Sequence, residues 1–305
     1  MEKVCILLSA FNGEKYIEIQ IESIMKQINI ESIIVVRDDG STDKTKEIIM
    51  SLKEKYKNKI FYIEGKNLGC EASFLNLLKY NFDADFYAFS DQDDFWMPDK
   101  LYKQIEAIKK YNTPALSLCN LLVCDENLNT IKIMHNAKEL NEYKTRMKRD
   151  IICNMHGCVM LWNKNLHTIL QNNIPNKIVA HDAWLNAVAN LIGTVEIISE
   201  PLIKYRIHDN NVSGFALNNI AKIKKGARIY LGKNHPNREY IAKTLLYFFG
   251  KNIDKKIEGY KTLILISNYK YSFFNKIKLI NSDIVQKRDI CHKYLWIICI
   301  LMNKF

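Results

Sequence analysis

A short acidic stretch that follows an apolar segment constrains this chain more than any other feature. Residues Ser90 to Trp96 (SDQDDFW) come directly after Phe86 to Phe89 (FYAF), which we predict to end a buried strand. In an α/β sheet, the carboxyl end of a strand faces the usual ligand crevice. Carboxylates this close together repel one another unless a cation or hydrogen-bond donors lie between them. The stretch therefore predicts a ligand site at one edge of a sheet.

The spacing of the acids in this stretch favours a metal site. Asp91 and Asp93 lie two residues apart on an extended segment, so their side chains point to the same side. A hard divalent ion such as Mg²⁺ or Mn²⁺ takes carboxylate oxygens together with substrate phosphates. The alternative is a solvated acidic turn that caps a helix beginning near Pro98. We favour the metal interpretation because the preceding strand is so apolar.

Strand and helix patterns alternate along the first two thirds of the chain. Apolar segments at 4–10, 33–36, 60–63 and 86–90 predict strands, and helices are expected between them at 14–27, 43–56 and 71–80. This is the βαβ pattern of a parallel sheet. Further along, we expect a helix to about 110, a strand at 115–124 paired with 130–134, and partial helix at 136–149. Residues 152–162 are expected to be a loop that runs into a strand, and helices are expected at 165–171 and 181–191. A strand at 194–199 is expected to break at Glu200-Pro201, after which 202–207 leads into a polar loop.

Two loops after predicted strands also carry candidate ligand-binding residues. Asp38 and Asp39 follow the second strand, where carboxylates can accept hydrogen bonds from a base or from ribose hydroxyls. They can equally serve as turn and helix-cap residues, and we expect both roles, with at least one Asp left for ligand. In the loop from Gly65 to Gly69, glycine lets the backbone approach a ligand closely, and Lys66 is placed to meet phosphate.

Two histidine-containing segments leave alternatives open. Asp182 lies in the first turn of the helix that His181 begins, beside apolar residues. It is either a helix cap or a catalytic base whose pKa is raised by partial desolvation. His208, in a polar loop near the end of the last predicted strand, is either a third metal ligand or a hydrogen-bonded loop residue.

Charge is distributed unevenly along the 305 residues. Residues 222–305 hold 18 Lys and Arg against 5 Asp and Glu, a net charge of +13, whereas residues 1–221 carry −2. Basic residues there interleave with aromatic and aliphatic ones, which is typical of interfacial helices and favours contact with an anionic membrane surface. The alternative is a helical bundle that packs on the catalytic body and exposes a solvated basic face.

Membrane-spanning and secreted classes are disfavoured. No apolar run reaches ~18 residues, and the last one, 294–302, is too short to span a bilayer. The N-terminal segment turns polar too quickly for a signal peptide and is expected to be the first core strand. Eight cysteines include the pairs Cys119/Cys124 and Cys153/Cys158, but their spacing is too wide for a zinc site of the C-x₂-C type. A reducing, cytoplasmic location is the simpler inference.

Taken together, residues 3–215 resemble family 2 glycosyltransferases of the GT-A fold. The likeness is strongest to the bacterial rhamnosyltransferase-like branch, which builds capsules, O-antigens and cell-wall polysaccharides. The segments that carry it, in chain order, are 9–16 (SAFNGEKY), 37–43 (RDDGSTD), 67–69 (NLG), 90–96 (SDQDDFW), 157–158 (GC), 181–184 (HDAW) and 205–214 (YRIHDNNVSG). Seven short motifs in the same order make a specific signal.

The resemblance implies an architecture and a set of roles. It implies a GT-A catalytic domain over 1–215. The basic helical region that the sequence predicts over 216–305 has no counterpart in the family pattern. Asp91 and Asp93 match the D-x-D motif that holds Mg²⁺ or Mn²⁺ against the donor diphosphate, His208 matches a late ligand to metal or diphosphate, and Asp182 matches the catalytic base. The implied donor-binding residues are Ala10, Asn12, Asp38, Asp39, Lys66, Asn67, Gly69, Asp91, Gln92 and His208. The implied acceptor pocket comprises Trp96, His181 and Trp184, although Ala183 departs from the aromatic residue that this branch often has there.

The function implied is transfer of a sugar, with inversion, from a UDP-sugar or dTDP-rhamnose to a hydroxyl of a glycan or glycolipid. Two alternatives stay open: a nucleotidyltransferase of similar fold, and a non-enzymatic basic module that binds membrane or nucleic acid. A nucleotidyltransferase would require a Gly-rich loop with Arg and Lys directly after the first strand. Residues 11–14 (FNGE) lack that pattern, which counts against this alternative. We expect no nucleic-acid partner and a location on the inner face of the cell membrane. The basic helices could also mediate homo-oligomer contacts instead of docking on lipid.

Overall fold

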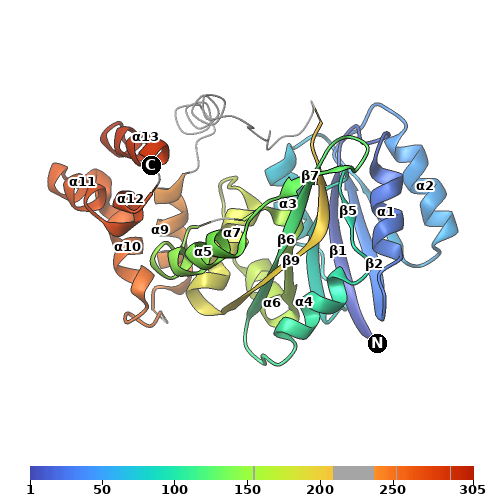
Figure 1. The fold of residues 1–305 in the computed structure, drawn as a ribbon, viewed down its shortest axis with the longest axis horizontal. Coiled ribbons are helices and arrows are strands. Elements are labelled where there is room, and N and C mark those ends of the chain that lie inside the picture. Colours follow the sequence, from blue (N-terminus) through green and yellow to red (C-terminus); the bar gives the residue numbers. More distant parts are fainter. Residues whose placement is uncertain (154, 209–236, 252, 289) are drawn as a thin grey trace.

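In the part of the chain that the structure describes, nine strands form one mixed, mostly parallel sheet that is flanked by helices (Figure 1), which confirms the predicted α/β fold. The computed structural model describes residues 1–153, 155–208, 237–251, 253–288 and 290–305. Strand β1 (Glu2–Ala10) lies between β2 (Ile30–Asp38) and β4 (Phe86–Ser90), parallel to both, and β3 (Ile60–Glu64) continues the parallel part beyond β2. Val4 to Leu8 are buried, as expected of a central parallel strand covered on both faces.

The second half of the sheet is mixed. Its strands are β5 (Phe95–Trp96), β6 (Ala115–Cys124), β7 (Thr130–Ile133), β8 (Met160–Asn163) and β9 (Thr194–Arg206). They complete the order β3-β2-β1-β4-β8-β6-β9-β5, with β7 paired to β6 as the predicted hairpin. Strand β8 runs antiparallel to both of its neighbours, whereas β6 and β9 are parallel. The parallel half thus supplies strand ends that meet at one edge.

Helices connect these strands and cover the sheet. They are α1 (Ile17–Met25), α2 (Thr45–Lys55), α3 (Cys70–Leu77), α4 (Lys100–Ile108), α5 (Ala137–Arg149), α6 (Lys164–Asn172) and α7 (His181–Ile192), with a 3₁₀ turn at Gly157–Val159. The C-terminal part contains α9 (Arg238–Phe249), α10 (Glu258–Asn268), a 3₁₀ turn at Tyr269–Tyr271, α11 (Phe273–Ile280), α12 (Asp283–Gln286) and α13 (Ile290–Leu301). None of the helices in the described ranges has the length and apolarity needed to cross a membrane.

Strand β9 and helix α5 differ from the sequence prediction, and the short strand β5 was not predicted. The break expected at Glu200-Pro201 is absent, and β9 runs through it as one strand. Proline lacks an N–H for the ladder, and the β6–β9 pairing shifts register around Asn120, opposite Pro201. Helix α5, expected only in part, is helical throughout because Asn136 and Glu139 form a reciprocal capping box and Leu140, Tyr143 and Met147 give it a buried face.

The C-terminal helices pack on the catalytic body, as one of the two sequence alternatives expected. Helix α10 contacts α5, and the Phe248 ring of α9 packs edge-on against Trp184 of α7 with centroids 6.2 Å apart. Arg238 of α9 donates to the Ile152 carbonyl at 3.0 Å. The predicted boundary at 215/216 and the basic segment at 222–233 lie outside the described residues.

One buried carboxylate connects this region to the body. Asp150, which follows α5, is fully buried and pairs with Arg238 of α9 and, at 3.0 Å, with Arg288 after α12. Both guanidinium groups also lie over the buried ring of Trp296, at 4.7 Å and 4.0 Å from its centroid. Asp150 therefore forms buried ion pairs that connect the end of α5 to α9 and to the segment after α12.

Candidate active site

The carboxyl ends of β1, β2 and β4 border a cavity of about 1,010 Å³. Register places these ends together, since Ala10 lies beside Asp38 and Leu8 beside Ser90. Ten of the residues predicted from the sequence line the cavity: Asn12, Asp39, Asn67, Gly69, Asp91, Gln92, Asp93, His181, Asp182 and His208. Segments that are far apart in the chain thus converge on one chamber.

Asp38 and Asp39 are engaged in holding loops. Asp38 is buried; its Oδ1 accepts from the Ser41 N–H at 2.9 Å, and its Oδ2 accepts from the Tyr62 hydroxyl at 2.9 Å. Asp39 pairs with Arg37, and its Oδ2 accepts from the backbone N–H groups of residues 68 and 69 at 2.9 and 2.8 Å. Asp39 lines the cavity and Asp38 lies behind it, so the turn-and-cap interpretation describes Asp38 well.

The loop after β1 is fixed by two side-chain amides. The Gln92 amide accepts from the Phe11 N–H at 2.9 Å and donates to the Phe11 carbonyl at 3.0 Å. Asn12, with a positive φ of 48°, accepts from the Thr42 N–H at 2.8 Å through Oδ1. A Cβ on Gly13 would lie only 2.2 Å from the Gln92 amide oxygen, so this close approach requires glycine. The acidic turn and the β1 loop therefore hold each other in place.

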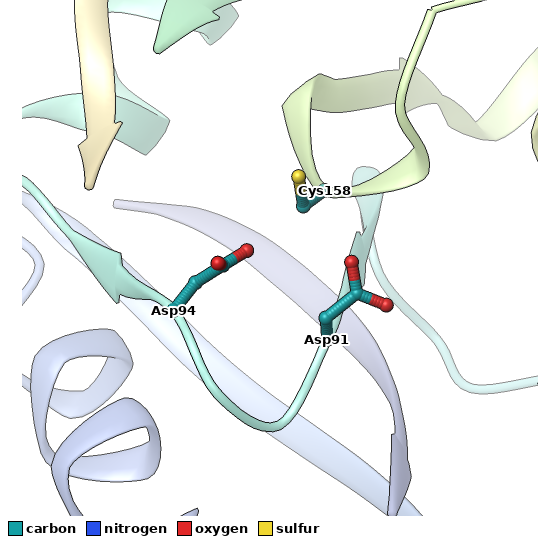
Figure 2. Close-up of side chains that lie close together, drawn as sticks. All are labelled: Asp91, Asp94 and Cys158. Atoms are coloured by element: carbon teal, nitrogen blue, oxygen red, sulfur yellow. The ribbon is translucent and has the colours of Figure 1, made fainter. Parts of the chain in front are cut away.

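The acids of the turn separate into two groups. Asp93 Oδ2 lies 2.7 Å from His208 Nε2. Asp91 instead faces Asp94 and Cys158, and one potential ligand atom from each of these three side chains lies within 4.8 Å of the others (Figure 2). Among the described residues, this is the one such group of potential metal ligands. The predicted set of Asp91, Asp93 and His208 is therefore not assembled around one point in this conformation, in which His208 contacts Asp93 and Asp91 faces Asp94 and Cys158.

Burial and mutual repulsion perturb these acids. The surrounding protein, with the nearby carboxylates of Asp93 and Asp182, raises the pKa of Asp91 to about 7. Burial raises the pKa of Asp94 well above its usual range, and Asp93 and Asp91 add to the effect. Asp94 Oδ1 accepts from the Arg206 N–H at 3.3 Å, whereas its buried Oδ2 has no hydrogen-bond partner of normal geometry. The turn thus concentrates more negative charge than its protein neighbours neutralise.

Helix α7 delivers Asp182 to the opposite wall. Asp182 is half-buried, and its Oδ1 accepts from the Ala183 N–H at 2.6 Å. It also lines the cavity near Asp91, so it combines the helix-cap geometry with exposure to the chamber. His181 is buried against Phe74, with ring centroids 4.0 Å apart, and burial lowers its pKa to about 3. His181 is therefore neutral at physiological pH.

Five predicted residues lie outside the cavity lining. Trp96 and Trp184 are fully buried, which corrects the prediction that they form the pocket surface. The Trp96 ring instead packs 3.8 Å from Nζ of the buried Lys100. Lys66 is exposed, and its carbonyl accepts from Arg37 at 3.1 Å. Ala10 is buried, and its carbonyl accepts from the Asp39 N–H at 2.7 Å, so Ala10, like Asp38, supports the wall from behind.

The structure adds residues that the sequence did not single out. Tyr16 lines the cavity, with its ring 5.0 Å from that of His208 and 4.5 Å from the guanidinium of buried Arg206. Arg206 Nε donates to the Asp93 carbonyl at 2.8 Å. The adjacency of Arg206 and His208 at the end of β9 was a usable signal, because the same strand end brings both to the acidic turn. The proximity of Cys158 to Asp94 had no local signal.

Comparison with known proteins identifies the family. The model for glycosyl transferase family 2 matches residues 5–169, which is more than half of the chain. The chain belongs to this family. It is an inverting GT-A glycosyltransferase that uses a nucleotide-sugar donor, so the predicted family and enzyme class are confirmed and the non-enzymatic alternative is set aside.

Individual relatives are distant. An uncharacterised glycosyltransferase of Rickettsia typhi is 28% identical over 222 residues, covering 71% of this chain and 68% of the relative. The dTDP-rhamnosyl transferase RfbG of Shigella flexneri is 27% identical over 248 residues, covering 77% and 82%. Two solved structures share the fold, each with a TM-score of 0.55. They are Staphylococcus aureus TarS with UDP (17% identity; 97% and 78% covered) and mannosyltransferase PcManGT of Pyrobaculum calidifontis with GDP-Man and Mn²⁺ (14%; 99% and 86%).

Proposed function

We propose that this family 2 enzyme transfers a hexosyl or deoxyhexosyl group to a glycan or glycolipid hydroxyl during synthesis of a capsule, O-antigen or cell-wall polysaccharide. The donor is a UDP-sugar or dTDP-rhamnose. The observation that carries the proposal is the single cavity onto which Asp91, Asp93 and Asp182 all open. Similarity to the dTDP-rhamnosyl transferase RfbG supports dTDP-rhamnose as the donor, and similarity to TarS, solved with UDP, supports a UDP-sugar.

The acidic turn fits a divalent metal ion. Asp91 and Asp93, with His208, would hold Mg²⁺ or Mn²⁺ once His208 separates from the Asp93 carboxylate that it contacts in this conformation. Oxygen-rich ligands of this kind suit either ion. The raised pKa of Asp91 and the unpartnered, buried Oδ2 of Asp94 both indicate charge that a cation would stabilise. When bound, such an ion supplies Lewis acidity and neutralises charge on a diphosphate leaving group. The PcManGT structure is a complex with GDP-Man and Mn²⁺, which supports the same choice here.

Asp182 is the proposed catalytic base. It would accept the proton of the acceptor hydroxyl as that oxygen attacks the anomeric carbon, and the sugar would pass through an oxocarbenium-like state. The hydrogen bond from the Ala183 N–H fixes the carboxylate at the start of α7. His181 is no competing base, because its low pKa reflects a stacked, buried ring that positions the helix start.

Donor binding is assigned to the loops after β1, β2 and β3. Asn12, Asp39, Asn67 and Gly69 line the cavity beside the acidic turn, and Gly69 has a φ of 84°, which glycine adopts without strain. These groups offer carbonyl, amide and carboxylate contacts to a base and a ribose. Lys66 is exposed on the same loop, outside the cavity lining, and is assigned to contact with a donor phosphate.

A donor screen tests the proposed function. Purified protein with Mn²⁺ or Mg²⁺ is incubated with a panel of nucleotide sugars and a mixed glycolipid acceptor, and release of nucleoside diphosphate is measured with and without EDTA. We expect metal-dependent release from one pyrimidine donor. The absence of both turnover and nucleotide binding, with either metal, would contradict the assignment of Asp39, Asp91 and Asp93.

The pKa of Asp91 predicts how metal affinity responds to pH. A proton on Asp91 competes with the metal, so below about pH 7 the Mn²⁺ affinity should fall about tenfold per pH unit, and above pH 7 it should level off. Isothermal titration with Mn²⁺ from pH 5.5 to 8.5 measures this dependence. In Asp91→Asn, most of the Mn²⁺ affinity should be lost, and the affinity that remains should not fall between pH 7 and pH 5.5. A pH-independent affinity in the unsubstituted protein would contradict the assignment.

We also propose that residues 1–215 form the catalytic domain and residues 216–305 a basic helical region that operates beside it. The asymmetry of charge, +13 in residues 222–305 against −2 before them, supports a cytoplasmic enzyme held at the inner face of the cell membrane. Limited proteolysis between the two regions, followed by activity measurement on a soluble acceptor, tests whether they are separable.

A further inference from the structure

Helices α11 and α13 expose an apolar surface that the catalytic function does not explain. Phe273 and Phe274 of α11 are 70% and 64% exposed, and Tyr294 of α13 is 62% exposed. Ile277, Ile298, Leu301 and Met302 are exposed as well. We define these seven residues as the apolar face. Isolated exposed apolar residues are normal, but two adjacent helices that both expose them indicate an interaction surface.

The pattern along α13 shows that this exposure is systematic. Its sequence, ICHKYLWIICIL, contains a single Lys, Arg, Asp or Glu. Trp296, Cys299 and Ile300 are buried, whereas Tyr294, Ile298 and Leu301 are spaced along the opposite side. A helix that is apolar on all sides is normally buried on all sides. This one buries only the side that faces the protein, and twelve residues are too few to span a bilayer.

Helix α11 repeats the pattern and joins the same surface. Leu279 is buried, and Phe273, Phe274 and Ile277 lie on the exposed side. Lys276 Nζ donates to the Leu301 carbonyl at 3.1 Å, which connects α11 to the end of α13. Figure 1 shows both helices at the end of the molecule away from β1 and β2. The apolar face is therefore separate from the catalytic cavity.

Basic groups accompany the apolar face. Lys278 Nζ lies 4.6 Å from the centroid of the Phe274 ring. Helix α12, which packs on both α13 and α5, borders a cleft of about 820 Å³ against α5. Five basic side chains line this cleft, against two acidic ones: Lys138, Arg146, Arg149, Lys287 and Arg288 against Glu142 and Asp283. Three of the five are paired with acids, Arg149 with Glu258, Lys287 with Asp283 and Arg288 with Asp150. Aromatic and aliphatic groups beside a basic cleft match the boundary between lipid headgroups and acyl chains.

Resting on the membrane location proposed above, we propose that the apolar face inserts into the interfacial region of an anionic lipid bilayer, with the exposed Lys278 beside Phe274 placed to meet headgroup phosphates. Charge favours lipid over a second copy of this chain. Residues 237–305 hold 13 Lys and Arg against 5 Asp and Glu, so two copies placed face to face would repel each other. An anionic bilayer attracts the same charge.

Vesicle flotation of the full chain tests this proposal. Vesicles are made of phosphatidylcholine alone or with about 30 mol% phosphatidylglycerol, at about 0.05 and 0.5 M NaCl. We expect the protein to float with the anionic vesicles at low salt, and at least about tenfold less binding to neutral vesicles or at high salt. Phe274→Ser/Ile298→Ser should lower binding to anionic vesicles at least about tenfold. Lys278→Glu should lower it at low salt.

A matched control and a second measurement keep the result specific. Ile178→Ser removes an equally apolar side chain, 67% exposed, that lies outside α11 and α13, and its binding should equal that of the unsubstituted protein. Circular dichroism checks that all variants are folded. No flotation of the unsubstituted protein, or unchanged flotation of the double variant, would overturn the proposal. So would a dimer in sedimentation velocity that the double variant dissociates. Binding alone is measured, so the outcome is independent of the donor chemistry.

Discussion

Asp182→Asn should lower kcat by about 10²–10⁴-fold while the affinity for the donor nucleotide changes by less than about threefold. Asparagine keeps the shape of the side chain and can still accept the N–H of Ala183, now through its amide oxygen, so the start of α7 should be preserved. What is lost is the ability to take a proton. Steady-state release of nucleoside diphosphate with saturating donor and acceptor measures kcat, and calorimetry measures donor affinity.

Glu71→Gln is the matched control for this variant. Glu71 also lines the cavity, at the start of α3, and no catalytic role is assigned to it. Its substitution should change kcat by less than about threefold, within the range expected for loss of one exposed charge. An Asp182→Asn enzyme that retained more than a tenth of its kcat would show that another group removes the proton.

Asp150→Ala should destabilise the folded chain by about 3–5 kcal/mol. Asp150 is fully buried, and both of its partners, Arg238 and Arg288, are largely buried too. Removing the carboxylate leaves two guanidinium groups in a poorly solvated environment without their counter-charge. The free energy of unfolding is obtained from urea titration followed by circular dichroism, with α9 and the α12–α13 connection expected to loosen first.

Asp283→Ala provides the comparison on the same helical region. Asp283 pairs with Lys287 at 2.6 Å, but both side chains are more than half exposed. An exposed pair at this spacing contributes less than about 1 kcal/mol. Equal, small effects of the two substitutions would mean that Asp150 does not anchor the C-terminal helices.

The bounds of some strands could be predicted from the residues within and beside them. Strands β4 and β6 begin and end where the apolar runs predicted, since charged or turn-forming residues bound both of them. Strand β9 could not be predicted as one element, because Pro201 breaks a strand by local rules. The register of its pairing with β6 shifts at that residue, which accommodates the missing N–H. Helix α5 is helical over more residues than predicted, because a capping box and a narrow apolar face stabilise it despite its polar composition.

The site shows the same division between local and tertiary information. That Asp91, Asp93 and Asp182 meet follows from strand ends and a helix start, which motif order indicates. That Trp96 and Trp184 are buried, and that Cys158 lies beside Asp94, depends on packing between distant segments. The pairing of Asp93 with His208 is equally non-local, and sequence alone assigned both residues to one metal without indicating this contact.

Nucleotide binding as a function of Mn²⁺ tests the central claim most directly, namely that the acidic turn holds a donor diphosphate through a divalent ion. Calorimetric titration of UDP and dTDP into the protein, with and without Mn²⁺, compares the unsubstituted chain with Asp91→Asn. The predicted result is that Mn²⁺ strengthens binding of one nucleotide at least about tenfold and that the substitution abolishes this gain. Nucleotide binding that is equally strong without Mn²⁺ and in Asp91→Asn would contradict the account.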